Sequence, residues 1–123
     1  MPKFQFVILY VDSPEISAGF YARLLGVSPM EQSPTFAMLP LTDGVMLGLW
    51  QKGGVGPAVT VPPGGNEIAL VAEDRAEVTA THAAWRAQGV TIAQSPCAMD
   101  FGYTFTALDP DGHRIRVLTP EQP

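Results

Sequence analysis

The sequence predicts an α+β fold in which two β-α-β-β-β modules form a cupped mixed sheet, with both helices on its outer face. Three observations predict this fold. The same order of elements occurs twice, at a period of roughly sixty residues. A segment rich in Gly and Pro separates the two occurrences. Each helix directly follows a strand, and helices in that position cover one face of a sheet. We expect one domain over residues 1–123, with modules at 1–51 and 66–123 and a linker at 52–65.

The first module opens with an apolar run, followed by a helix that carries signals at both ends. Phe4–Val11 is almost continuously apolar and rich in aromatic and β-branched residues, which predicts a strand buried on both faces. Ser13 is a favourable N-cap, Pro14 suits the first helical position, and Gly26 ends the helix. The apolar stripe of this helix is expected at Ile16, Phe20 and Leu24.

Alternation and turn residues place the remaining strands of the first module. Strands are expected around Thr35–Leu39 and at Val45–Gln51, joined by a turn at Thr42-Asp43-Gly44. Beyond them, repeated Gly and Pro pairs from Lys52 to Gly65 exclude regular elements and indicate the linker.

The second module repeats this order. Glu67–Ala72 predicts a strand, and Asp74 with Glu77 forms a capping box for a helix that ends at Gly89. The run Asp109–Arg114 reads Asp-Pro-Asp-Gly-His-Arg and predicts a tight hairpin turn. The apolar stripe of the helix is expected at Val78, His82 and Trp85. The other strands are expected at Val90–Gln94, Tyr103–Leu108 and Arg114–Leu118.

Composition restricts the class of protein and its partners. A hydrophobic content of 46% with 15% charged residues excludes a disordered chain. The net charge of −5 and the absence of a basic cluster disfavour nucleic acid and anionic membranes as partners. Cys97 is the only cysteine, which excludes an internal disulfide and favours a reducing, cytoplasmic location. No run approaches the ~20 apolar residues of a membrane span, and the first residues show no signal-peptide pattern.

Two motifs give the chain its resemblance to a known superfamily. The motifs are Ser13-Pro14-Glu15 … Gly19-Phe20-Tyr21 … Leu24-Leu25-Gly26 and the turn at residues 109–114. Together they resemble the vicinal oxygen chelate superfamily, which includes glyoxalase I, bleomycin-resistance proteins and extradiol dioxygenases. The resemblance implies two βαβββ modules. It also implies a homodimer, because members of the superfamily commonly pair modules between subunits.

The resemblance further implies where a divalent metal would be held, and most ligands are missing there. The corresponding positions are Phe6, Gly48, Glu67 and Arg116. The common family pattern has His in place of Phe6 and Glu in place of Arg116. Phe and Gly side chains donate nothing, and Arg is permanently cationic. Because one carboxylate does not hold a hard divalent cation, we expect no metal, no cofactor and no catalytic residue.

Glu67 and Arg116 are expected to form a charge pair where the metal would lie. In one interpretation, one or both side chains address a polar group on a ligand. In the other, they neutralise each other at the floor of a cavity, because a lone buried charge is costly. The sequence leaves both interpretations open.

An aromatic lining is predicted for the sheet face away from the helices. Strand alternation places Met46, Gly48 and Trp50 on one face. Gly48 beside Trp50 predicts open space over the indole ring, which suits a planar guest. The alternative is that Trp50 fills the cavity as core. The same parity directs toward the cavity the side chains of Phe4, Phe6, Ile8 and Tyr10.

Further motifs point to one branch of the superfamily: Val11 … Ser17 … Phe20-Tyr21, Leu49-Trp50 before the Gly-rich segment, Glu67-Ile68, Phe101-Gly102 … Thr104-Phe105, and Asp109-Pro110-Asp111-Gly112-His113 … Ile115-Arg116-Val117. In these motifs the chain resembles the metal-free branch that confers resistance to phenazine antibiotics. This resemblance implies that Trp50 stacks on a planar tricyclic guest. Phe101 and Tyr103 are expected at the cavity rim, or else in plain packing.

The sequence therefore predicts metal-independent sequestration of a planar aromatic small molecule, such as a phenazine antibiotic. One alternative is a metal-dependent lyase or isomerase of the glyoxalase or dioxygenase type. Another is a vestigial module whose cavity is filled. Of the remaining reactive residues, His82 is expected in the core, His113 toward the helix layer, and Cys97 as a passive thiol in a loop.

Overall fold

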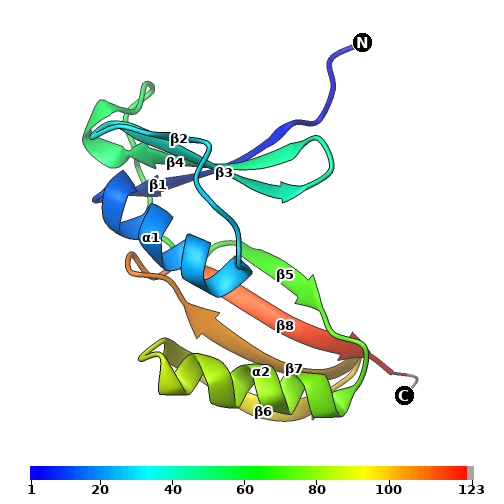
Figure 1. Ribbon diagram of the computed structural model, residues 1–123. Coiled ribbons are helices and arrows are strands. Elements are labelled where there is room, and N and C mark those ends of the chain that lie inside the picture. Colours follow the sequence, from blue (N-terminus) through cyan, green and yellow to red (C-terminus); the bar gives the residue numbers. More distant parts are fainter. Residues whose placement is uncertain (122–123) are drawn as a thin grey trace. The chain divides into compact units, whose positions relative to one another are not determined.

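A computed structural model describes residues 1–121 of the chain (Figure 1). The polypeptide divides into two compact units, Met1–Val61 and Pro62–Pro123. Each unit has its own four-stranded mixed sheet and its own long helix. No helix within residues 1–121 combines the length and the hydropathy needed to cross a membrane.

The first unit contains one βαβββ module. Its strands lie in the order β1-β4-β3-β2, with β1 parallel to β4 and the other neighbours antiparallel. A short 3₁₀ turn, η1, follows the last strand. The elements are β1 (Phe6–Val11), α1 (Pro14–Leu25), β2 (Glu31–Gln32), β3 (Phe36–Thr42), β4 (Val45–Gln51) and η1 (Lys52–Gly54).

The second unit repeats this topology. Its strands lie in the order β5-β8-β7-β6, again with one parallel pair, β5 with β8. The predicted fold class of two βαβββ modules is therefore confirmed. The elements are β5 (Glu67–Val71), α2 (Arg75–Ala87), β6 (Thr91–Met99), β7 (Gly102–Leu108) and β8 (Arg114–Pro120).

Helix α1 has the predicted ends but a different buried face. The Ser13 hydroxyl accepts a hydrogen bond from the Ile16 N–H at 3.2 Å, and Gly26 ends the helix with φ of +67°. The predicted apolar stripe is wrong at Ile16, which is 64% exposed, whereas Phe20 and Leu24 are half-buried. The residues that face the sheet are Pro14, Ser17, Ala18 and Tyr21. Ser and Ala at the centre of this face let the helix lie close to β3 and β4, a packing preference that hydropathy does not register.

Strand β1 is buried on one face only, contrary to the prediction. Leu9 and Val11 are buried on the helix side. The alternate residues Phe6, Ile8 and Tyr10 are 39%, 43% and 41% exposed. The strand begins at Phe6, so Phe4 lies outside it. Alternate residues of a strand point to the same face of the sheet. Leu9 and Val11 therefore lie on the covered face, and Phe6, Ile8 and Tyr10 lie on the open face.

Helix α2 also begins at its predicted cap. The Asp74 carboxylate accepts a hydrogen bond from the Glu77 N–H at 2.9 Å. Glu77 in turn accepts from the N–H of Glu73, one residue before the position that a standard capping box uses. The predicted stripe is confirmed, since Val78 and Trp85 are buried and His82 packs on the Phe105 ring (see below).

The structure differs from the predicted strands at β2 and β6. The two-residue strand β2 was not predicted, because a pair as polar as Glu31-Gln32 carries no hydrophobic pattern. Strand β6 extends to Met99, so Cys97 lies in a strand and not in a loop. Pro96 does not interrupt it because β6 is an edge strand with register shifts, where a missing N–H is tolerated.

Candidate functional site

The first unit presents an apolar sheet face opposite α1. In the parallel pair, Phe6 lies beside Met46, Ile8 beside Gly48 and Tyr10 beside Trp50. Residues on one face of a strand recur every two positions, so these side chains share the face that the helix does not cover. The structure thus brings together the four predicted site residues of this unit, Phe6, Met46, Gly48 and Trp50.

Trp50 is half-buried and has an aromatic neighbour. The rings of Tyr10 and Trp50 meet edge to face, with centroids 6.2 Å apart and an angle of 77° between planes. Such pairs stabilise each other beyond the area that they bury. The contact fixes the indole on the sheet while part of its surface remains accessible.

Gly48 does not leave open space, contrary to the prediction. A Cβ at this position would lie 3.0 Å from Phe36 Cζ and 3.3 Å from Ile8 Cγ1. Phe36 belongs to β3 and pairs in register with Trp50. Its ring therefore extends along the sheet and fills the volume above the glycine. The absence of a side chain at Gly48 makes room for the Phe36 ring, and this ring forms the part of the apolar face that lies over Gly48.

The second unit presents a polar network on the corresponding face of its sheet. Arg116 Nε donates to Glu67 Oε1 at 2.6 Å. Its Nη1 donates to Gln94 Oε1 and to Thr104 Oγ1, both at 3.2 Å. The predicted Glu67–Arg116 charge pair is therefore present, and two further polar side chains hold it.

The supporting side chains of this network are themselves fixed. The Thr104 hydroxyl donates to the Val117 carbonyl oxygen at 2.8 Å. Gln94 Oε1 also accepts from the Thr106 hydroxyl at 3.1 Å. Thr104 and Thr106 are buried. Fully connected buried polar groups of this kind hold one geometry, so the guanidinium is rigidly placed.

The ion pair lies between core and solvent. The Arg116 side chain is 14% exposed and that of Glu67 is 33% exposed. The Phe101 ring centroid lies 5.7 Å from Arg116 Cζ, which places Phe101 beside the network, on the side that the sequence predicted. Because each charge has an oppositely charged partner, the network carries no net charge.

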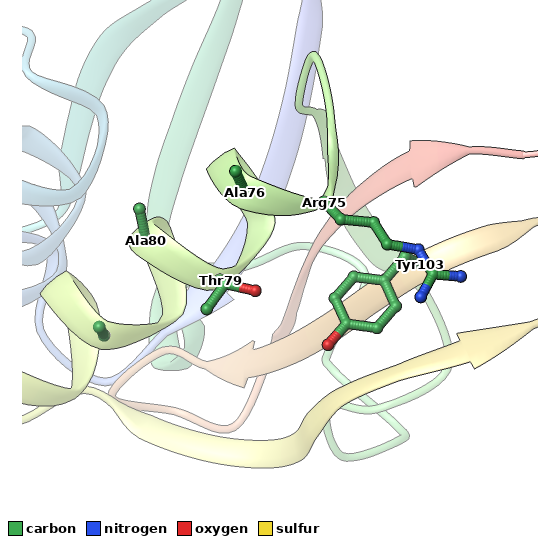
Figure 2. Close-up of a pocket in the computed structure, with 6 residues that line it drawn as sticks. Arg75, Ala76, Thr79, Ala80 and Tyr103 are labelled. Atoms are coloured by element: carbon green, nitrogen blue, oxygen red, sulfur yellow. The ribbon is translucent and has the colours of Figure 1, made fainter.

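Tyr103 lies on the opposite face of this sheet, so the prediction that it shares a rim with Phe101 is wrong. The residue alternates with Thr104, which belongs to the Arg116 network. Arg75 Cζ lies 4.4 Å from the centroid of the Tyr103 ring. Figure 2 shows this ring beside α2, where it borders an open groove of about 520 Å³. The other residues that line the groove are Arg75, Ala76, Thr79, Ala80 and Ala83.

The four positions matched to family metal ligands occupy equivalent places in the two sheets. Phe6 pairs in register with Met46, and Gly48 follows two residues later. Glu67 pairs with Arg114, and Arg116 likewise follows two residues later. Each module thus contributes one diagonal pair, in agreement with the repeat seen in the sequence.

The chemistry of these diagonal positions does not fit a divalent metal. Phe6 and Gly48 offer no donor atoms, and the side chain of Arg116 is a cation. Glu67 already accepts a charge-assisted hydrogen bond through Oε1. Within residues 1–121, no three His, Cys, Asp or Glu side chains gather closely enough to hold a metal ion.

The remaining reactive side chains lie within the second unit. The His82 ring packs 5.2 Å from the Phe105 ring, and its Nε2 is buried without a hydrogen-bond partner in the described residues. The backbone N–H of His113 donates to Asp109 Oδ1 at 2.9 Å and closes the hairpin turn. Cys97 pairs in register with Thr104 and is half-buried.

Sequence reasoning missed Phe36, Gln94 and Thr104. Phe36 lay inside a predicted strand, and counting two residues at a time from Trp50 across the hairpin would have placed it on the apolar face. Gln94 and Thr104 give no comparable signal. Their partnership with Arg116 depends on the register of three strands and on two register shifts in β6.

Comparison with known proteins agrees with this architecture. Residues 3–117 match the model of the glyoxalase/bleomycin resistance protein/dioxygenase superfamily. The chain is 29% identical over 113 residues to the phenazine antibiotic resistance protein EhpR of Enterobacter agglomerans, covering 89% of this chain and 86% of that protein.

Solved structures of two relatives share the fold. Protein ATC0852 from Agrobacterium tumefaciens is 50% identical, with a TM-score of 0.88 over 98% of this chain and 99% of that one. A glyoxalase-related enzyme from Fulvimarina pelagi is 25% identical, with a TM-score of 0.83 over 97% of this chain and 88% of that one. With a family match that spans nearly its whole length, the chain belongs to the glyoxalase/bleomycin resistance protein/dioxygenase superfamily.

Proposed function

We propose that this protein binds and sequesters a planar aromatic small molecule without a metal ion. The observation that carries the proposal is the apolar face of the first unit, where Phe6, Ile8 and Tyr10 are each about two-fifths exposed beside Trp50. A soluble chain that leaves aromatic side chains together at its surface commonly uses them in binding.

The apolar face suits a flat, weakly polar guest. An indole held by an edge-to-face contact with Tyr10 offers a ring surface whose orientation is fixed before binding. Met46, next to Phe6 in the register, adds a flexible and polarisable wall. Stacking of a heteroaromatic ring on an aromatic side chain contributes about 1–3 kcal/mol, and burial of the remaining apolar surface adds to it.

A phenazine is the first guest to test. The chain's similarity to the phenazine antibiotic resistance protein EhpR supports this choice. The mismatch between the family metal positions and the residues found here supports a mechanism of capture. In such a mechanism the protein protects by holding the antibiotic and not by transforming it.

The experiment measures quenching of Trp50 fluorescence by phenazine in a Trp85→Phe background. Trp85 is the only other tryptophan, and it lies on the buried face of α2 with 5% of its surface exposed. We expect saturable quenching at micromolar phenazine. Addition of EDTA should leave the dissociation constant unchanged, because no metal takes part.

A second substitution separates binding from packing. Trp50→Ala should weaken phenazine binding by about 1–3 kcal/mol, while the free energy of unfolding changes little because the indole is only half-buried. If Trp50 is core instead, the same substitution should cost about 3–5 kcal/mol of stability. A large stability loss without quenching by any tricyclic aromatic would refute the proposed function.

A further inference from the structure

The Phe36 ring occupies a space that the backbone of the first sheet leaves free. Gly48 lies on the middle strand of three, beside Ile8 of β1 and Met38 of β3 in the register. Because Gly48 has no side chain, a recess remains above it between these two neighbours, here called the Gly48 slot. A Cβ at Gly48 would lie 3.0 Å from Phe36 Cζ and 3.3 Å from Ile8 Cγ1. The chain thus fills the slot with an aromatic ring of its own.

The backbone of Phe36 is fixed by hydrogen bonds, whereas few contacts hold its ring. The Phe36 N–H donates to Ser33 Oγ at 3.1 Å, and the Phe36 carbonyl oxygen accepts from the Ser33 N–H at 2.8 Å. Phe36 is half-buried. Unlike the rings of Tyr10 and Trp50, its ring is paired with no other aromatic ring within residues 1–121. A change of side-chain rotamer can therefore take the ring out of the slot while β3 stays in place.

The ring that fills the slot indicates which guests fit there. The floor of the slot is the buried backbone of Gly48, and its present occupant is a flat hydrocarbon ring. Trp50 follows Gly48 by two residues and so lies on the same face. A flat guest that lies against Trp50 is next to the slot and can place one of its rings there, whereas a globular guest is too thick.

We infer that Phe36 is an internal competitor of the aromatic guest, whose ring must leave the Gly48 slot before the guest can use it. The inference rests on the proposed function for the identity of the guest. In this role Phe36 lowers the apparent affinity of the site by the fraction of molecules in which the slot is open. It also sets the preference for flat rings, because only such a ring replaces its own.

The test is the dissociation constant for phenazine, measured by calorimetry so that the readout does not depend on Trp50 fluorescence. Phe36→Leu keeps an apolar side chain on β3 and removes the ring tip that lies over Gly48. We expect this variant to bind phenazine about tenfold more tightly than the wild type, which corresponds to a slot open in about one wild-type molecule in ten. If the ring instead belongs to the surface on which the guest stacks, the variant should bind more weakly.

Two further measurements locate the effect in the slot. Gly48→Ala in the Phe36→Leu background places a methyl group in the slot, so the gain in affinity should disappear. The globular apolar probe 1-adamantanol should bind no more tightly to Phe36→Leu than to the wild type.

Phe20→Leu is the matched control. It removes another half-buried ring of the same unit, but from α1, which packs on the opposite face of the sheet. Its dissociation constant for phenazine should equal that of the wild type. Phe36→Val, whose β-branched side chain suits a strand, replaces Phe36→Leu if the leucine variant does not fold.

The outcomes separate this inference from the proposed function. If the wild type binds phenazine and Phe36→Leu, folded as judged by circular dichroism, binds it equally or more weakly, the inference is overturned and the proposed function stands. The same holds if the added Gly48→Ala leaves the gain intact. If neither the wild type nor Phe36→Leu binds phenazine, the proposed function fails and the inference fails with it.

Discussion

Gly102 is a position where the backbone admits no other residue. Its φ is +152°, and a Cβ there would overlap the Thr119 carbonyl oxygen and lie 2.9 Å from Pro120 Cα. These are backbone atoms of the neighbouring strand β8, so no side chain can move aside. The glycine is what lets β7 begin directly against the end of β8.

Gly102→Ala is therefore expected to destabilise the protein by about 2–4 kcal/mol, since strain and a backbone clash act together. The measurement is the free energy of unfolding in urea. Gly65→Ala is the control, because a Cβ at Gly65 would meet nothing within 4 Å. A loss below about 0.5 kcal/mol for Gly102→Ala would show that the strand end relaxes to admit the methyl group.

At the scale of single residues, the sequence predicted which face of a strand a side chain occupies, but not what packs over that face. Strand parity correctly placed Phe6, Met46 and Trp50 on one face, because alternation is a property of the strand itself. The empty volume expected over Gly48 was wrong, because it depended on a side chain of another strand. A glycine indicates that something lies close to the backbone, but the sequence around it does not say whether that is a ligand or, as here, the Phe36 ring.

At the scale of elements, the ion pair between Arg75 and Glu121, here called the clasp, connects the start of α2 to the residue that follows β8. Arg75 donates from Nε and Nη2 to the two carboxylate oxygens of Glu121, at 2.6 and 2.7 Å. The guanidinium also lies over the Tyr103 ring of β7. The start of α2, the start of β7 and the residue that follows β8 thus meet at one guanidinium group.

The clasp predicts a pH dependence of stability. The hydrogen bonds from Arg75 hold the pKa of the Glu121 carboxyl below its usual range. A lowered pKa in the folded state means that the contribution is complete above the unfolded pKa of about 4.3 and is lost as the pH falls through the folded value. Both side chains are substantially exposed, so solvent screening keeps the effect small.

Glu121→Gln should accordingly lower Tm slightly at pH 7, and the difference from wild type should vanish toward pH 3. Thermal unfolding followed by circular dichroism between these pH values measures it, with Glu73→Gln as the control for a lost exposed carboxylate. A Tm difference that stays constant across this range would mean that the Glu121 charge makes no contribution.

Elements differ in how far the sequence determines them. The starts of α1 and α2 were predicted correctly because Ser13 and Asp74 act on N–H groups three residues away, which is a local interaction. The buried face of α1 was not predicted correctly. Ser17 and Ala18 lie on it because their small side chains let the helix approach the sheet closely, which hydropathy does not indicate. Strand β2 depends entirely on pairing with β3, since its own two residues are polar.

At the scale of the whole molecule, we propose a homodimer. The support lies in open strand edges, because β1 and β5 are edge strands of their sheets. Open strand edges are features that natural proteins tend to cover.

Light scattering should report about twice the chain mass of 13.2 kDa at micromolar concentration. Val71→Lys adds a charge to the exposed face of the edge strand β5 and should shift the equilibrium toward the monomer, whereas Glu31→Lys on the polar strand β2 should not. A monomer at every concentration from micromolar to millimolar would contradict the proposal.

The candidate site was only partly accessible to prediction at this scale. The resemblance to the superfamily supplied the four diagonal positions, and the order of the elements located them along this chain. The Arg116 network was not foreseen beyond Glu67. Gln94 and Thr104 reach Arg116 only after three strands pair with particular register shifts, and those shifts come from packing across the whole sheet.

The equivalent diagonals carry a consequence for protein engineering. One backbone geometry occurs twice, once with the hydrocarbon pair Phe6 and Gly48 and once with the ionic pair Glu67 and Arg116. Side chains at these places make no backbone hydrogen bonds of the ladders, so the polarity of a half can be changed without breaking its ladders, provided that Phe36 is also shortened wherever a larger residue replaces Gly48. A redesign of either half must therefore exchange a diagonal pair together with the neighbours that pack on it, Phe36 in the first unit or Gln94 and Thr104 in the second.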